Sequence, residues 1–163
     1  MDGTGTAERI FTAPDAGASM ETRSEVEAVA GRGLRGDRYF SENETGTFVS
    51  WEQSEARDDG YDLTLIEAEA IDAIARDAGI ELDPGEHRRN VVTRDAALNH
   101  LVGTRFRVGD AICRGDRLCE PCRYLQDLVG ADVLDALAHR GGLRADILVS
   151  GTVRPGDTVE PLE

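Results

Sequence analysis

The sequence contains no lysine, and all 18 of its basic residues are arginines. A lysine amine is the group that forms a Schiff base with pyridoxal phosphate or a carbonyl substrate, so the chain excludes that covalent chemistry. Aromatic residues make up only 5% of the chain, so Val, Ile, Leu and Ala must supply most of the core. The 163 residues suffice for one domain with its own core, and we expect a single domain over residues 1–163.

Long apolar runs are also missing. No window of 18 apolar residues occurs, so we expect no membrane span. The first residues, MDGTGTAERIF, lack the basic and apolar regions of a signal peptide, which predicts a cytoplasmic protein. We expect residues 1–7 to be a frayed end.

The excess charge is negative and is spread along the whole chain, with a net value of −14. An acidic surface repels phosphates, so nucleic acid is not an expected partner. Together with the missing lysine, this composition is typical of proteins from extreme halophiles. In about 1 M salt the repulsion would be screened within about 3 Å.

Short apolar alternations predict strands at residues 8–14 and 24–30, joined by a turn, and a further strand at 63–66. Helical spacing over 67–77 predicts a helix that ends at Gly79.

Between these elements, the glycine-rich residues 31–40 are expected to form a loop, and the acidic residues 41–60 a surface excursion. The second half of the chain predicts a loop and strand at 87–93, a helical turn near 98–101, and a strand pair turning at Gly109 and Asp110. Two short helices and two final strands follow the last cysteine. Many short strands with few helices indicate a mainly β protein of the α+β class, a β-barrel with attached helices.

The three cysteines allow several kinds of chemistry. Cys119 and Cys122 form a C-x-P-C pair that resembles a thioredoxin-like redox motif, although the short remaining chain fits that fold poorly. A zinc site would combine Cys113, Cys119 and Cys122 with His87 or His100, at a spacing that is not standard.

A third interpretation of the cysteines assigns them different roles. Cys113 lies in an apolar strand and fits a core position. Cys122 follows Pro121, opens a predicted helix and has Arg117 and Arg123 nearby, which favours a reactive thiolate. Cys119 is then an accessory thiol.

Two loops, GLRGDRY and EHRRN, gather arginines beside glycine or asparagine. Arginine binds phosphate or carboxylate through two parallel hydrogen bonds, and glycine lets a backbone approach such a group closely. Arginines on so acidic a protein can equally form salt bridges or face solvent. The candidate anion-binding residues are Arg35, Asp37 (as a group that orients Arg38), Arg38, His87, Arg88, Arg89 and Asn90.

Several segments in a fixed order resemble the MOSC domain, the C-terminal domain of molybdenum cofactor sulfurases, which also occurs as small stand-alone proteins. The resemblance runs from about residue 24 to the C-terminus. It rests on GLRGDRY, LTLIEAEAI, GEHRRNVV, LNHLVGTRFRVGDA, CEPCRYL and RGGLRADILVSGTVRPGDTVE.

The resemblance implies a closed, barrel-like β domain with a few peripheral helices. It places the characteristic cysteine of the family, found in a "PC" context, on Cys122. That sulfur would either carry a persulfide received from a pyridoxal-phosphate cysteine desulfurase or ligate the molybdenum of the molybdenum cofactor. Family-level pyridoxal phosphate binding would belong to the partner, because this chain lacks lysine.

Three functions therefore remain open. The first is a persulfide carrier or molybdenum-cofactor-binding module that uses Cys122 as the working sulfur. The second is a molybdenum-dependent reductase of N-hydroxylated compounds that needs a redox partner. The third is a C-x-x-C thiol redox protein in which Cys119 and Cys122 both act.

Overall fold

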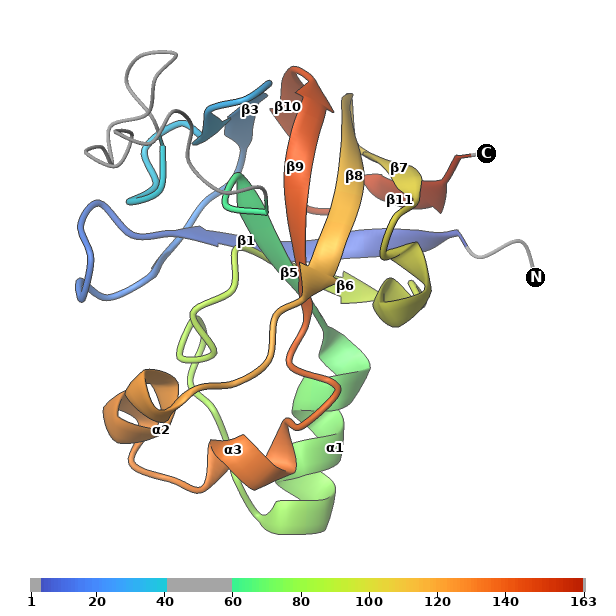
Figure 1. The fold of residues 1–163 in the computed structure, drawn as a ribbon. Helices are drawn as coiled ribbons and strands as arrows, with labels where there is room; N and C mark the ends of the chain where they lie inside the picture. Colours follow the sequence, from blue (N-terminus) through green and yellow to red (C-terminus); the bar gives the residue numbers. More distant parts are fainter. Residues whose placement is uncertain (1–3, 41–59, 163) are drawn as a thin grey trace.

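A closed β-barrel forms the main body of the protein (Figure 1). The computed structural model describes residues 4–40 and 60–162. Seven strands follow one another around the barrel in the order β11-β7-β8-β9-β5-β6-β1, and a β1–β11 pairing closes it. Within the barrel β5 and β6 run parallel, while the other neighbours pair antiparallel, so the barrel is mixed.

The strands are short, as the sequence predicted. Their bounds are β1 (Gly5–Thr12), β2 (Glu21–Thr22), β3 (Val26–Val29), β4 (Gly33–Leu34), β5 (Leu63–Glu67), β6 (Val91–Arg94), β7 (Arg105–Val108), β8 (Ala111–Leu118), β9 (Leu143–Val149), β10 (Gly151–Val153) and β11 (Thr158–Pro161). Strand β2 extends the barrel sheet beside β1, and β10, β3 and β4 form a small separate sheet.

Alternating apolar side chains fill the barrel. In β8, Ala111, Cys113 and Gly115 are buried, whereas the residues between them are partly or fully exposed. Strand β5 is buried over Leu63–Ile66, because one face meets the barrel interior and the other meets the helices. This double burial explains why LTLI is a continuous apolar run.

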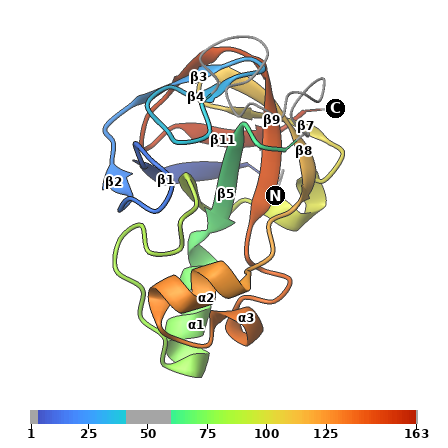
Figure 2. The ribbon, with the colours of Figure 1, turned by 60° about the vertical axis from the view of Figure 1, so that its left-hand side comes forward.

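The helices gather at one end of the barrel, where Figure 1 and Figure 2 both show them below the strands. They are α1 (Ala68–Ala78), α2 (Arg123–Val129) and α3 (Val133–Ala136), and a 3₁₀ turn, η2, spans Leu98–Leu101. A second apolar cluster, which includes Ile66, Ile74, Leu125 and Leu137, joins the helices to the barrel. No helix in the described ranges has the length and apolar content needed to cross a membrane.

Most of the predicted elements are confirmed, and three predictions need correction. Residues 5–7 are not frayed, because β1 begins at Gly5 and pairs with β11 there. The expected loop at 31–40 contains the two-residue strand β4, which pairs with β3. An additional strand, β10, forms before the last turn and pairs with β3. The predicted surface excursion falls almost entirely on residues 41–59, which lie outside the described ranges.

Gly142 precedes β9 and packs closely against the backbone of β5. Its φ is +118°, and a Cβ at this position would lie 2.1 Å from the carbonyl oxygen of Leu65. Backbone strain and overlap together predict that Gly142→Ala lowers the free energy of unfolding by about 2–5 kcal/mol. Gly130→Ala is the matched control, since Gly130 also has positive φ (+77°) but has open space around it. Urea denaturation of both variants checks this, and equal losses would contradict the packing argument.

Candidate functional site

A small pocket opens where the barrel meets the helical end, and it contains two of the three cysteines. Its volume is about 80 Å³. The lining residues come from six separate segments and are Arg38, Tyr39, Thr64, Arg88, Arg89, Cys119, Cys122, Tyr124, Leu125 and Arg144. We call this the cysteine pocket. Its described lining includes four arginines and no carboxylate, in a chain whose net charge is −14.

The two cysteines sit differently within the pocket. Cys119 follows the end of β8 and is 3% exposed. Cys122 is exposed and occupies the N-cap position of α2, with an extended backbone. Its carbonyl accepts a hydrogen bond from Gln126, so the helix begins directly after the cysteine. The thiol at Cys122 is therefore the one that a partner or ligand can reach from solvent.

The buried side chain of Arg89 holds the cysteine loop against the barrel. Its guanidinium donates to the carbonyl oxygens of Gly141 (2.7 Å), Cys119 (2.8 Å) and His87 (3.1 Å), with a longer contact to Glu120 (3.5 Å). These acceptors belong to three different loops, so one side chain ties the three together. The sequence predicts that Arg89 binds an anion, whereas these hydrogen bonds join its guanidinium to protein backbone.

Arg38 and Arg88 form the cationic wall of the pocket. Asp37 is buried and accepts a hydrogen bond from Arg38 Nη1 (3.1 Å), so it orients Arg38 as expected. Arg38 Nη2 in turn donates to the carbonyl of Arg88 (3.2 Å). Burial and the nearby Arg38 guanidinium lower the pKa of Arg88. This mutual repulsion favours an anion between the two side chains.

A ladder of aromatic rings and guanidinium groups continues from this wall. The guanidinium carbon of Arg38 lies 4.6 Å from the ring centre of Tyr39, and Tyr39 lies 5.8 Å from Tyr61. Arg144 and Arg117 lie over Tyr61 at 5.1 and 5.8 Å. Such cation–π contacts are attractive, and Arg38, Tyr39 and Arg144 of this ladder line the pocket.

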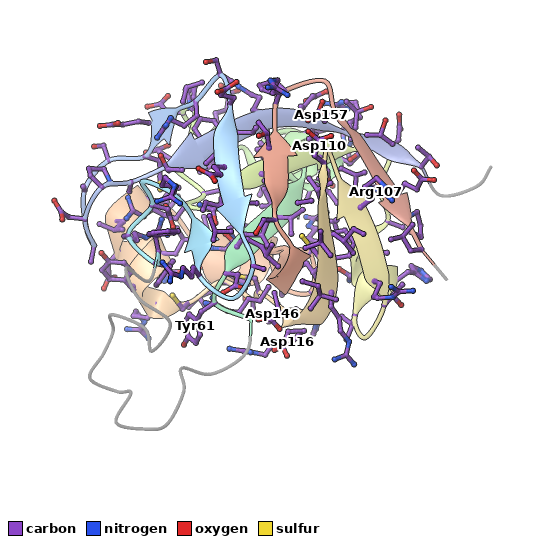
Figure 3. The ribbon with its side chains drawn as sticks, turned by 90° about the horizontal axis from the view of Figure 1, so that it is seen from above. Tyr61, Arg107, Asp110, Asp116, Asp146 and Asp157 are labelled. Atoms are coloured by element: carbon purple, nitrogen blue, oxygen red, sulfur yellow. The ribbon has the colours of Figure 1, made fainter. Side chains whose placement is uncertain are left out.

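Acidic residues stand near the far end of this ladder. Figure 3 shows Tyr61 at the same rim of the barrel as Asp116 and Asp146. Asp146 accepts the backbone N–H of Gly60 (2.6 Å), and Asp116 pairs with Arg117. These contacts hold the segment that leads into β5, which carries Tyr61.

His87 and Asn90 are buried beside the pocket instead of lining it. The Nδ1 of His87 accepts a hydrogen bond from the backbone N–H of Arg89 (2.9 Å), and its ring packs edge-on against Phe11. Asn90 bridges strands, since its Nδ2 donates to Phe11 (3.1 Å) and its Oδ1 accepts from the backbone of Thr64 (3.0 Å). Both residues support the fold where we predicted ligand contact.

Arg35 lies apart from the cysteine pocket. Its side chain is exposed, pairs with Glu27 at 2.8 Å and stacks over Phe40. Sequence reasoning missed Arg144, Tyr124, Tyr39 and Thr64 as lining residues. The signal for Tyr124 was its position two residues after Cys122, whereas Arg144 is distant in sequence and joins only through the β8–β9 pairing.

The zinc interpretation of the cysteines is wrong for the described part of the chain. No group of three or more His, Cys, Asp or Glu residues suited to a metal ion occurs there. Cys113 is 1% exposed within the barrel core, as expected, and burial raises the pKa of its thiol to about 12. Cys113 is therefore an inert packing residue.

Comparisons with known proteins agree with this architecture. The family model described as the MOSC domain matches residues 55–160. The YuaD protein from Bacillus subtilis has a similar structure, with a TM-score of 0.74 and 19% identity over 96% of this chain and 94% of that chain. Among curated proteins, none matches this sequence.

Two further solved structures share the fold. YiiM from Geobacillus stearothermophilus has a TM-score of 0.70 and 13% identity, over 98% of this chain and 75% of that chain. YiiM from Escherichia coli has a TM-score of 0.65 and 18% identity, over 98% of this chain and 70% of that chain. At these identities the likeness establishes the barrel fold.

We expect Arg89→Lys to loosen the cysteine loop, because an ammonium group cannot reproduce the forked contacts of the guanidinium. The free energy of unfolding should fall by about 1–3 kcal/mol, the usual cost of leaving buried polar groups unpaired. Brief alkylation followed by intact-mass analysis should show modification of Cys119 as well as Cys122. Arg35→Lys is the control, and equal behaviour of the two variants would contradict the role of Arg89.

The buried side chain of His87 leads us to expect that the protein loses stability in mild acid. Burial, reinforced by the nearby Arg89 and Arg9, lowers its pKa from 6.5 to about 3. The unfolded chain gains a proton at His87 as pH falls below 6.5, but the folded chain does not until about pH 3. The free energy of unfolding should therefore fall as pH drops through this window, by at most about 1.4 kcal/mol per pH unit.

The variant His87→Asn isolates this effect, since Asn keeps an acceptor for the N–H of Arg89 but does not titrate. Denaturant titrations between pH 7 and pH 5 should show a shallower pH dependence in the variant. Parallel curves for the two proteins would show that His87 is not the group responsible.

Proposed function

Because the chain belongs to the MOSC domain family, we propose that it handles sulfur through Cys122, which carries a persulfide in the cysteine pocket. The observation that carries this proposal is one exposed thiol inside a small pocket lined by four arginines. An accessible thiol can accept a sulfur atom, and positive charge stabilises its thiolate and persulfide anions.

The transfer itself needs no redox partner. The Cys122 thiolate attacks the terminal sulfur of a donor persulfide, the donor S–S bond breaks, and the donor thiolate leaves. One sulfur atom moves and the total oxidation state is unchanged. A cysteine desulfurase that uses pyridoxal phosphate is the expected donor, because this lysine-free chain cannot form the required Schiff base.

The side chains of the cysteine pocket also support a second role, in which Cys122 is a thiolate ligand of the molybdenum cofactor. A soft thiolate suits such a metal, and Arg38 and Arg88 suit its anionic phosphate. The cysteine pocket alone is too small for a pterin. A groove of about 330 Å³, lined in part by Met20, Pro84 and Leu128, shares Arg88 with it and reaches the usual range of about 300–1,000 Å³.

When bound, the cofactor would supply oxygen-atom and electron transfer, and reduction of N-hydroxylated compounds would depend on that second role. The residues of this chain would bind its phosphate at Arg38 and Arg88 and its metal at Cys122. Tyr39 and Tyr124 would shield the bound group from water at the pocket rim.

One preparation distinguishes the two roles. The wild type and Cys122→Ser are produced in a host that makes molybdenum cofactor, and metal content and intact mass are measured. The same proteins are then incubated with a cysteine desulfurase and cysteine. We expect the wild type, and not the variant, to gain the mass of one sulfur atom.

Molybdenum near one atom per chain that disappears in Cys122→Ser would instead favour the cofactor role. Cys113→Ala is the matched control, because it removes a cysteine from the core and leaves the pocket intact. Equal sulfur uptake by the wild type and Cys122→Ser would overturn the assignment of Cys122.

A further inference from the structure

The cysteine pocket holds a second thiol that the proposed transfer to Cys122 does not use. We propose that Cys119 is a resolving thiol, which converts a persulfide on Cys122 into free sulfide and a Cys119–Cys122 disulfide. This inference rests on the proposed persulfide role of Cys122. It determines the form in which sulfur leaves the protein, which is hydrosulfide instead of a transferred sulfur atom.

The backbone of Cys119 is held firmly in place. Its N–H donates to the carbonyl of Gly142 (2.8 Å), and its carbonyl accepts from Arg89 (2.8 Å). Gly141 packs so tightly against this residue that an added Cβ would lie 2.6 Å from the carbonyl oxygen of Cys119. Both backbone polar groups are thus occupied, and the sulfur is the part of Cys119 left for chemistry.

Cys122 has more freedom than Cys119. Its side chain makes no capping hydrogen bond to α2 and is exposed at the first turn. It can therefore receive sulfur at the surface and rotate toward the pocket interior, where Cys119 is sheltered from solvent. Both residues line the same pocket of only about 80 Å³, so the two side chains border one small space.

The proposed step balances without an outside oxidant. The Cys119 thiolate attacks Sγ of the Cys122 persulfide, the bond to the terminal sulfur breaks, and hydrosulfide leaves. The terminal sulfur is reduced by two electrons while the two cysteine sulfurs are oxidised to a disulfide. Arg38, Arg88 and Arg144 line the pocket, and their positive charge stabilises the departing anion. A dithiol reductant would return the disulfide to two thiols.

Cys113 cannot act as the resolving thiol. It lies on β8 with its side chain in the barrel core, 1% exposed, and outside the lining of the cysteine pocket. Burial and the charge of Asp146 raise the pKa of its thiol to about 12, so little thiolate forms near neutral pH. It therefore provides an internal control for cysteine chemistry in the same chain.

The test uses the full chain with glutathione persulfide as the sulfur donor, followed by removal of excess donor. The proteins are the wild type, Cys119→Ser, Cys119→Ala and Cys113→Ala. Persulfide on Cys122 is followed by intact mass, released sulfide is measured by trapping with a bimane reagent, and the disulfide is located by peptide mapping.

In the wild type and Cys113→Ala, we expect persulfide loss to match sulfide release and formation of a Cys119–Cys122 disulfide. In both Cys119 variants the persulfide should persist, with sulfide release roughly tenfold slower or more. The wild-type rate should not change on dilution, because the two thiols belong to one chain.

Two results would overturn the inference in distinguishable ways. A persulfide on Cys122 that decays equally fast in the wild type and the Cys119 variants would exclude a resolving thiol, while the carrier role of Cys122 would stand. Failure of every protein to form the persulfide, including the Cys119 variants, would exclude both the carrier role and the resolving step.

Discussion

The buried guanidinium of Arg89 is the contact on which the site depends. Burying this charge is acceptable only because backbone carbonyls from the loops at His87, Cys119 and Gly141 surround it. Those loops belong to different parts of the chain and would otherwise end in unpaired polar groups. The barrel therefore fixes Arg89, and Arg89 fixes the loop that carries Cys119 and Cys122.

The cysteine pocket also differs in charge from the rest of the protein. The chain as a whole is strongly acidic, yet four arginines converge on one small pocket. Holding these charges together has a cost: burial and, second to it, the nearby Arg38 guanidinium lower the pKa of Arg88. Asp37 offsets part of that cost beneath Arg38, and an anionic sulfur species would offset more. The concentration of positive charge favours anions in the pocket, whereas the acidic remainder of the protein repels them.

Local patterns predicted most elements and part of the site. The helix ending at Gly79, the strand pair turning at Gly109 and the core position of Cys113 all follow from spacing and composition, and all are confirmed. Arg38 and Cys122 do lie in one pocket. The structure places Arg35 and His87 outside the lining of that pocket, and the sequence could not indicate this, since an arginine or histidine in a polar loop looks the same whether it meets solvent, backbone or ligand.

The sequence by itself determined the side chains available for chemistry: no lysine for a Schiff base, one C-x-P-C pair of cysteines, and arginine in place of lysine. It also determined the mainly β architecture, because alternation and turn residues act over short distances. Only the tertiary structure decided which arginines face the cysteines, why Arg89 binds backbone, and how Arg144 joins the pocket. These outcomes depend on strand pairings between residues far apart in the chain, which local patterns do not specify.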